Sequence, residues 1–343
     1  MSAGPHDSFA IIIPFKGVDN RLLECLSWCL SLDYPLGKTE IILLPDGDLS
    51  LSEIRKAMSS TILDGGRLEE ITRIITTGPL LPGAKRNIGM ANSSAANFAC
   101  IDSDAYPETD WLKSALELIQ HPEVGIVGGP SDMPKGISYF EKMSIQLWNL
   151  QCIHGRLYSL NKKKYGATLQ TDMNSNNFII RADVAKKCGY FDESIFPGED
   201  SVLCARVLTQ GYCILYSESV RVSHHRRPLF LPHLVSVIKY AESRIETFRR
   251  CPEQKRLVYF LPTLFLFFFS LGLISSLLDQ ALAIYFFLGL MFYSTIVLVD
   301  CLFCRIFNPI ELIILNVGAL LTHLAYGYGF SRAALRVMIS FGR

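Results

Sequence analysis

The sequence has almost no excess of charge of either sign. Its 33 Lys and Arg residues nearly balance 32 Asp and Glu residues, which gives a net charge of +1 at pH 7. This balance excludes a broadly basic surface, so we expect no nucleic-acid partner. We also expect no secretory leader, because residues 1–9 are polar and the apolar run at 10–15 is too short for a leader's hydrophobic core.

A cysteine pairing pattern is missing too. The ten cysteines are scattered along the chain without regular spacing. Reduced thiols in a domain that faces the cytosol fit this arrangement best. Cys301 and Cys304 form a Cys-x-x-Cys pair, but the sequence offers no second pair and no nearby histidine, which argues against a zinc or redox site.

Apolar residues are abundant and unevenly placed. Hydrophobic residues make up 50% of the 343-residue chain, and they are concentrated in its last third. The first two thirds have the composition of a soluble α/β protein. The chain therefore predicts one large domain followed by a membrane part.

Short apolar runs alternate with segments of helical spacing in the first two thirds. The apolar runs predict strands at 9–15, 40–44, 70–76, 98–101, 124–127, 178–180, 213–216 and 220–222. The helical spacing predicts helices at 19–32, 52–63, 84–91, 110–120, 182–188 and 201–210. This alternation favours a mainly parallel sheet with helices on both faces. The less regular segment 135–165 predicts a helix and a loop beside the active face.

Two carboxylates, Asp102 and Asp104, follow the buried strand predicted at 98–101. Side chains at i and i+2 of an extended segment point to the same side. Ligands of open α/β sheets bind beyond the carboxyl ends of the strands, and two hard oxygen ligands there suit a divalent cation that bridges a diphosphate. A solvated turn is the alternative, because Asp, Ser and Pro all favour turns.

Two further polar motifs lie at the ends of predicted elements, one after a strand and one at the start of a helix. Asp46 comes directly after the strand at 40–44 and can accept a hydrogen bond from a base or a ribose, or be a turn residue. Lys85 and Arg86 stand at the start of the next predicted helix. Such a helix start suits a phosphate or the edge of a nucleotide, although ordinary surface charge is the alternative.

A second acidic element, Glu199 and Asp200, opens the helix that runs to residue 210. A carboxylate in the first turn of a helix is often a cap. One well-placed carboxylate is also what is needed to take a proton from an attacking hydroxyl. His224 and His225 lie just beyond the last predicted strand. They can bind a metal or face a phosphate, or they can be ordinary surface histidines.

In their order and spacing, these motifs resemble those of family 2 glycosyltransferases, which have the GT-A fold. The resemblance covers residues 9–227 and rests on Ile11-Ile-Ile-Pro14, Asp46-Gly47, Arg86-Asn87-x-Gly89, Asp102-Ser103-Asp104, Gly189-Tyr-Phe-Asp192 and Gly198-Glu199-Asp200. The apolar tail, with His323-Leu-Ala-Tyr-Gly-Tyr-Gly-Phe330, is similar to the membrane-anchored exopolysaccharide subgroup, of which succinoglycan-type enzymes are examples.

The resemblance implies a role for each matching residue. It places Pro14, Asp46, Arg86 and Asp102 at the nucleotide, with Asp46 and Arg86 at the base and Asp102 at the ribose. It places Asp104 on a Mg²⁺ or Mn²⁺ ion at the diphosphate, with Asp102 and His224 as further metal ligands. Asp200 becomes the catalytic base, with Glu199 beside it.

Two departures from the family pattern limit the resemblance. Pro45 stands where the family usually has an acid, which makes recognition of the base less secure. The Gln-x-x-Arg-Trp signature of processive synthases is missing, since residues 226–230 read Arg-Arg-Pro-Leu-Phe. This argues against a polymerase similar to cellulose synthase.

An amphipathic segment at 231–256 links the expected catalytic domain, residues 1–230, to the membrane part, residues 257–343. Its apolar stripe consists of Leu234, Ile238, Ala241, Ile245 and Phe248. Such a helix either lies on an anionic membrane surface or packs on the catalytic domain.

Three apolar segments, 257–278, 281–299 and 312–330, are each near the roughly 20 residues needed to span a bilayer. Arg249, Arg250, Lys255 and Arg256 place the start of the first segment, and so the catalytic domain, on the cytoplasmic side of the inner membrane. Three crossings would leave Arg332, Arg336 and Arg343 outside, although positively charged residues are usually found on the cytoplasmic side. The sequence therefore allows either two or three transmembrane helices. The third segment either spans the membrane or is re-entrant or interfacial. Asn316 and His323 within it need partners or water.

The predicted activity is inverting transfer of a sugar from a nucleotide-diphosphate sugar to a hydroxyl of a lipid-linked saccharide at the membrane. A polyprenyl-phosphate sugar synthase, whose acceptor is a phosphate, is the nearest alternative. A non-catalytic channel or scaffold subunit with a degenerate nucleotide-binding domain is the alternative from another class. The sequence leaves the sugar, the acceptor and the oligomeric state open.

Overall fold

The computed structural model describes residues 7–58, 65–153 and 159–341, and they form two compact units. The first unit comprises residues 1–134 and 158–225, and the second comprises residues 135–157 and 226–343. The sequence predicted an unbroken catalytic domain over residues 1–230. The segment 135–157 instead packs within the second unit, because it carries a helix whose apolar face fits the carboxyl-terminal helices.

A sheet of nine strands forms the centre of the first unit, in the order β3-β2-β1-β4-β10-β6-β11-β9-β8. The strands are β1 (Phe9–Pro14), β2 (Thr39–Leu44), β3 (Thr72–Ile74), β4 (Asn97–Cys100), β6 (Val124–Gly128), β8 (Ser159–Lys164), β9 (Ala167–Gln170), β10 (Phe178–Arg181) and β11 (Cys213–Tyr216). Strands β1 to β4 are parallel, whereas β10 runs antiparallel to β4 and β6. The α/β class and the mixed sheet of the GT-A fold, which the resemblance implies, are confirmed. The mainly parallel sheet that the alternation predicted is wrong, because β10 and β9 pair antiparallel with their neighbours.

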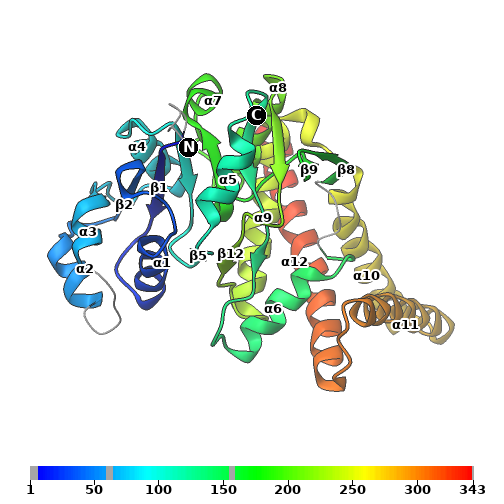
Figure 1. Ribbon diagram of the computed structural model, residues 1–343. Coiled ribbons are helices and arrows are strands. Elements are labelled where there is room, and N and C mark those ends of the chain that lie inside the picture. Colours follow the sequence, from blue (N-terminus) through cyan, green and yellow to red (C-terminus); the bar gives the residue numbers. More distant parts are fainter. Residues whose placement is uncertain (1–6, 59–64, 154–158, 342–343) are drawn as a thin grey trace. The chain divides into compact units, whose positions relative to one another are not determined.

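Helices cover both faces of this sheet (Figure 1). They are α1 (Asn20–Leu30), α2 (Leu51–Met58), α3 (Gly65–Ile71), α4 (Pro82–Ala91), α5 (Trp111–Ile119), α7 (Ala182–Lys187) and α8 (Glu199–Thr209). Strand β1 shows why its sequence is apolar throughout. Ile11 and Ile13 pack in the core beneath α1 and α5, and Ile12 packs in the core beneath α4 and α8. Successive side chains of a strand face opposite sides, so a strand covered on both faces has no polar positions.

The parallel strands end together at one edge of the sheet. Pro14 pairs with Leu44 across β1 and β2, and Ile12 pairs with Cys100 across β1 and β4. Asp46 and Asp102 follow two residues after the ends of β2 and β4. The register therefore brings both acids to this edge.

A small second sheet lies at the same strand end. It consists of β5 (Ala105–Pro107), β12 (Val222–His224) and β7 (Ser131–Asp132), in the order β5-β12-β7. Strand β12 pairs antiparallel with β5, and His224 lies opposite Ala105. This pairing joins residues far apart in the sequence and brings His224 next to Asp104.

The second unit consists of α6 (Tyr139–Asn149), α9 (Leu231–Arg250), α10 (Leu261–Leu278), α11 (Gln280–Phe303) and α12 (Pro309–Phe341). Its buried core joins Met143 and Leu147 of α6 to Val297 of α11 and Leu315 of α12. Part of the segment 135–165, residues 154–158, lies outside the described residues.

Helix α9 packs along α12. Gly329 of α12 allows this contact, because a Cβ atom there would lie 2.6 Å from the carbonyl oxygen of Ile238 and 3.1 Å from the Cβ of Ala241. Of the predicted apolar stripe, Ala241 and Phe248 are buried. The stripe thus packs on the carboxyl-terminal helix. The sequence had indicated only a membrane surface or the catalytic domain as its partner.

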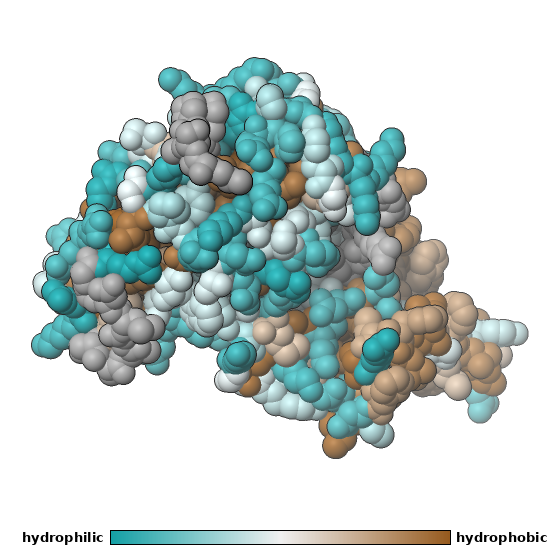
Figure 2. Space-filling model, in the orientation of Figure 1, coloured by the Kyte–Doolittle hydropathy of each residue, from teal (hydrophilic) through white to brown (hydrophobic). Residues whose placement is uncertain are grey.

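Three helical segments are long and apolar enough to cross a membrane: Leu257–Leu278, Gln280–Phe303 and Pro309–Ile339. Within the most apolar windows of the first two, 6% of the residues are buried, against 33% in the third. Hydrophobic side chains gather over α10 and α11, as Figure 2 shows. The expected apolar carboxyl-terminal helices are therefore present, and they indicate a membrane protein.

Candidate active site

Asp102 and Asp104 lie in a turn directly after β4. The turn is closed by a hydrogen bond from the Ala105 amide to the Asp102 carbonyl oxygen, at 3.0 Å. The expectation of an extended segment was wrong here, because the chain bends as it passes from β4 into β5. The turn still leaves both carboxylates partly exposed on the edge of the sheet.

His224 completes a group of three possible metal ligands with these two acids. One ligand atom from each of Asp102, Asp104 and His224 lies within 4.8 Å of the others, and His224 Nε2 is 3.4 Å from Asp104 Oδ1. Two carboxylates and an imidazole that converge in this way fit a divalent cation. The set predicted for the metal is therefore brought together.

Asn176 lies behind His224. Its Nδ2 donates to His224 Nδ1 at 2.8 Å and to Ser131 Oγ at 3.0 Å, while its Oδ1 is buried without a hydrogen-bond partner among the described residues. A half-turn of the amide would let Oδ1 accept a hydrogen bond from His224 Nδ1–H. The lone pair of His224 Nε2 would then face the two acids, as a metal ligand requires.

Arg86 connects this group to the second acidic element. The guanidinium is only 1% exposed, donates to Asp102 Oδ1 at 2.5 Å and to Glu199 Oε1 at 2.9 Å, and lies over the ring of Phe191. Burial alone would lower the pKa of Arg86, but the carboxylates of Asp102 and Glu199 raise it. Arg86 thus lies inside the protein rather than exposed to a nucleotide base, the position that the resemblance had implied.

Glu199 and Asp200 have different surroundings at the start of α8. Glu199 is 2% exposed, and burial, together with the adjacent Asp200 carboxylate, raises the pKa of Glu199 to about 7 despite the opposing charge of Arg86. Asp200 is partly exposed and accepts hydrogen bonds from the amides of Ser175 and Ser201, at 3.1 and 2.8 Å. Of the two, Asp200 is the carboxylate that a substrate can reach.

Lys85 binds Asp46 from inside the protein. Its ammonium group is buried and donates to the carbonyl oxygens of Phe15 and Leu44, at 2.6 and 3.1 Å, and to the Asp46 carboxylate. Three donors are thereby used, so Lys85 positions Asp46 and the ends of β1 and β2. Neither phosphate binding nor surface charge, the two roles considered for Lys85, matches this position.

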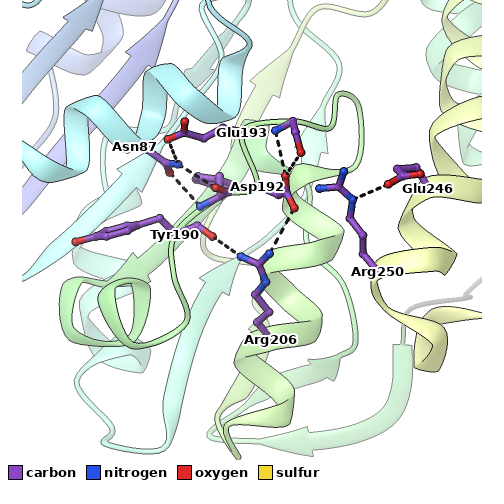
Figure 3. A network of polar contacts seen from close by, with 9 residues as sticks. Asn87, Tyr190, Asp192, Glu193, Arg206, Glu246 and Arg250 are labelled. Carbon is purple, nitrogen blue, oxygen red and sulfur yellow. Dashed lines mark hydrogen bonds and ion pairs between the residues drawn. The ribbon is translucent and has the colours of Figure 1, made fainter.

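The Gly189-to-Asp192 motif is held in place by α4 and α8 (Figure 3). Asn87 donates to the Phe191 carbonyl oxygen at 2.9 Å and accepts from the Phe191 amide at 3.0 Å. Arg206 donates to the Tyr190 carbonyl oxygen and to Asp192, both at 3.4 Å. Two motifs that are about one hundred residues apart thus form one structure, and it fixes the ring of Phe191 against Arg86.

The remaining predicted residues lie around the same edge. Pro14 is buried at the end of β1. His225 Nε2 is 3.2 Å from Glu24 Oε2 of α1. His225 therefore does not belong to the group of possible metal ligands.

Three residues gain a place at the site that the sequence did not assign to them: Asn176, Lys85 as the partner of Asp46, and Asp172. Asp172 accepts a hydrogen bond from Ser201 Oγ at 2.7 Å, beside Asp200. The polar run Asp172 to Asn177 was the available signal, since six mostly polar residues directly before a buried strand must find partners inside the fold.

Comparison with known proteins gives consistent matches. The sequence profile of Glycosyl transferase family 2 matches residues 10–189, more than half of the chain. Glycosyltransferase AglE of Haloferax volcanii is 26% identical over 221 residues, which are 64% of this chain and 67% of that protein. Pre-mycofactocin glycosyltransferase of Mycobacterium tuberculosis is 28% identical over 149 residues, 43% of this chain but only 30% of that longer protein.

Solved structures share the fold. A mannosyltransferase of Pyrobaculum calidifontis, solved in complex with GDP-Man and Mn²⁺, aligns with a TM-score of 0.58 and 12% identity over 94% of this chain and 87% of its own. GalNAc-T7, solved with UDP, GalNAc and Mn²⁺, aligns with a TM-score of 0.50 and 16% identity over 70% of this chain and 51% of its own. At these identities, the likeness shows the fold alone.

Proposed function

The chain belongs to glycosyl transferase family 2, and on that premise we propose that it moves a sugar from a nucleotide-diphosphate sugar to a hydroxyl of a lipid-linked saccharide, with inversion. The observation that carries this proposal is the chain of contacts from the Asp102, Asp104 and His224 group through Arg86 to Glu199 and Asp200. These contacts support a site for a diphosphate and its cation beside a carboxylate that can act as a base.

Asp102, Asp104 and His224 would hold the divalent cation, as the Mn²⁺ in the two solved neighbours suggests. When bound, this ion neutralises the charge that develops on the departing diphosphate. An imidazole among the ligands favours Mn²⁺ over Mg²⁺, which prefers oxygen ligands alone. Asp46, which is held by Lys85, would accept a hydrogen bond from the nucleoside.

Asp200 is the proposed base. It takes the proton of the acceptor hydroxyl as the hydroxyl oxygen attacks the anomeric carbon. The bond from that carbon to the diphosphate oxygen breaks, and the nucleoside diphosphate leaves with the electron pair. Attack from the face opposite the leaving group inverts the carbon. Glu199 and Arg86 position the carboxylates, because both side chains are buried in contact with each other.

The membrane part supports an acceptor that is carried by a lipid. Helices α10 and α11 expose almost entirely apolar surfaces, which fits contact with acyl chains. The arginines at the end of α9 and at residue 256 favour a cytoplasmic catalytic unit on a plasma membrane. A soluble saccharide acceptor would not require such an anchor.

Product analysis tests the proposal. The full-length protein in detergent is incubated with Mn²⁺, nucleotide sugars and lipid extracts from its host, and the product linkage is determined by NMR spectroscopy and mild acid treatment. We expect an acid-resistant glycoside whose anomeric configuration is opposite to that of the donor. An acid-labile sugar phosphodiester would instead identify a polyprenyl-phosphate sugar synthase, and retained configuration would refute inversion.

A further inference from the structure

Helix α1 lies beside β5, the strand that follows the turn with Asp102 and Asp104 (Figure 1). Its start is capped, because the Asp19 carboxylate accepts a hydrogen bond from the Leu22 amide at 2.9 Å. One face of the helix is buried in the core beneath the sheet, through Leu22, Cys25, Leu26, Cys29 and Leu30. A helix that is fixed in this way is a rigid support for the groups that its other residues contact.

Two residues of α1 contact the chain that carries Asp102 and Asp104. Cys25 is fully buried, and its thiol donates to the Asp102 carbonyl oxygen at 3.7 Å. Trp28, about one turn along the helix, stacks on Tyr106 of β5, with ring centres 5.4 Å apart and an angle of 14° between the rings. Residues 102–106, which include Asp104, are thus held at both ends by the same helix.

Glu24 makes a third contact, with the residue that follows His224. His225 Nε2 lies 3.2 Å from the Glu24 carboxylate. An ionised carboxylate can only accept, so Nε2 carries the hydrogen and donates it. Neighbouring side chains of an extended chain face opposite sides, and accordingly His224 faces Asp104 while His225 faces α1. The two adjacent histidines therefore have different roles, one in the group of possible metal ligands and one as its anchor.

The backbone of His225 joins this anchor to the acidic turn. Its amide donates to the Asp104 carbonyl oxygen at 2.9 Å, and its ring centre is 6.3 Å from that of Tyr106. A displacement of His225 would therefore move both Asp104 and His224. The distances between a metal and its ligands are fixed to within about 0.2 Å, so even a small displacement of two ligands weakens binding.

We propose that Glu24 is a positioning residue for the metal group. Through its hydrogen bond with His225, it holds His224 and Asp104 at the separation that a divalent cation requires. The proposal rests on the metal site in the proposed function. It extends that function to a residue of α1 that is not one of the possible metal ligands.

Binding of Mn²⁺ alone to the full-length protein in detergent tests this role without a measurement of activity. Electron paramagnetic resonance detects unbound Mn²⁺, so a titration gives the dissociation constant. We expect Glu24→Ala to raise this constant about 5- to 10-fold. A group that contacts a metal ligand directly typically contributes more, about 10- to 100-fold, but Glu24 acts through His225.

A conservative variant and a control accompany Glu24→Ala. Glu24→Gln keeps a side-chain oxygen that can accept from His225 Nε2–H, and it should recover most of the lost affinity. Glu117→Ala makes the same truncation at an exposed position of α5 and should bind Mn²⁺ as the wild type does. The Glu24 side chain is itself 39% exposed, so its truncation leaves no cavity in the core. Equal affinities in Glu24→Ala and Glu117→Ala would overturn the proposal.

A double variant tests the route through His225. His225→Phe keeps an aromatic ring but has no hydrogen to donate to Glu24. If Glu24 acts through His225, Glu24→Ala should cause no further loss of Mn²⁺ affinity in the His225→Phe protein. Losses that multiply in the double variant would refute this route.

Thermal unfolding of the same proteins without metal separates positioning from general support of the fold. A lower unfolding temperature of Glu24→Ala with unchanged Mn²⁺ affinity would show general support only and contradict the proposal. Asp104→Asn separates it from the proposed function. Binding that Asp104→Asn abolishes and Glu24→Ala leaves intact would overturn the role of Glu24 alone. Equal binding by the wild type and Asp104→Asn, or no binding by either, would overturn the metal site and this role with it.

Discussion

Arg86 shows how much of the candidate site depends on single buried side chains. It lies beneath the acidic edge and contacts Asp102 and Glu199, which are 97 residues apart in the chain. A buried charge is stable only when it is paired, so each of these carboxylates is held in one place by the same guanidinium. By fixing Asp102 and Glu199, Arg86 also determines where their partly exposed neighbours Asp104 and Asp200 lie.

The base assignment predicts a specific defect. Asp200→Asn keeps the size of the side chain and an oxygen that can accept from the Ser175 amide, but it cannot take a proton. We expect transfer to fall by about 10²- to 10⁴-fold, with donor binding nearly unchanged. Single-turnover kinetics and donor titration measure the two quantities. Transfer within about 5-fold of wild type would refute the assignment.

Asn176 is predicted to position a metal ligand. Asn176→Ala removes the group that orients His224, so we expect the Mn²⁺ concentration for half-maximal activity to rise about 10- to 100-fold. Manganese titration of the full-length enzyme measures this change. Asn174→Ala, at an exposed position on the same segment, is the control and should match the wild type. Equal manganese requirements in the two variants would contradict the role of Asn176.

The raised pKa of Glu199 predicts that the stability of the protein depends on pH. Its pKa is about 7 in the folded protein, against 4.5 for the unperturbed group. Between these values the folded form keeps a proton that the unfolded form has lost. The free energy of unfolding therefore falls as pH rises from 4.5 to 7, by up to about 3 kcal/mol from this group.

Thermal unfolding between pH 5 and pH 8 measures that slope. Glu199→Gln has no proton to lose, so its unfolding temperature should fall less over this range than that of the wild type. Glu193→Gln alters an exposed carboxylate nearby and should keep the wild-type slope. Identical slopes in all three proteins would show that Glu199 has an ordinary pKa.

Residues next to strand ends could be predicted from the sequence, and their partners could not. Asp46, Asp102 and Asp104 follow apolar runs directly, so local pattern places them at one edge. The pairing of Arg86 with Glu199, or of His224 with Asn176, depends on tertiary contacts across 113 and 48 residues. The family resemblance supplied some of these roles, but not the burial that makes Arg86 and Lys85 internal.

At the scale of elements, the packing of α10 against α12 bears on the membrane topology. Phe260 contacts Phe330 with ring centres 5.1 Å apart, and Phe265 contacts His323 at 6.0 Å. Residue numbers rise along α10 as they fall along α12, so these helices run antiparallel. The end of α12, with Arg332 and Arg336, therefore lies on the same side as the start of α10.

This arrangement predicts that both ends of the chain face the cytoplasm, with an even number of crossings between them. One of the three apolar helices would then not span, which removes the conflict of Arg332 and Arg336 with the distribution of positive charge. Fusion of green fluorescent protein or alkaline phosphatase to the carboxyl terminus reports its side in bacterial cells. We expect fluorescence and no phosphatase activity. The reverse would show three complete crossings.

The sequence predicted most elements because their periodicity is strong, and the misses have physical causes. The small sheet β5-β12-β7 escaped prediction because its strands have only two or three residues, too few to show alternation. The grouping of α6 with the membrane helices also escaped, because an amphipathic face does not identify its partner. The polar residues Asn316 and His323 found partners in Ser294 and Tyr293 of α11.

For the whole molecule, the central claim is that one nucleotide sugar and one cation bind at the edge formed by Asp46, Asp102, Asp104 and His224. The alternative from another class is a membrane subunit with a degenerate nucleotide-binding domain. Binding of a true donor stabilises the folded protein, by about 2.7 kcal/mol when the ligand is at one hundred times its dissociation constant.

The most direct measurement is therefore thermal unfolding of the full-length protein with a panel of nucleotide sugars, with Mn²⁺ or with a chelator, for the wild type and for Asp104→Asn. We predict that one nucleotide sugar raises the unfolding temperature by several degrees with Mn²⁺, that the chelator removes most of the rise, and that Asp104→Asn abolishes its dependence on Mn²⁺. No stabilisation by any nucleotide sugar, or an equal Mn²⁺-dependent rise in Asp104→Asn, would contradict the account.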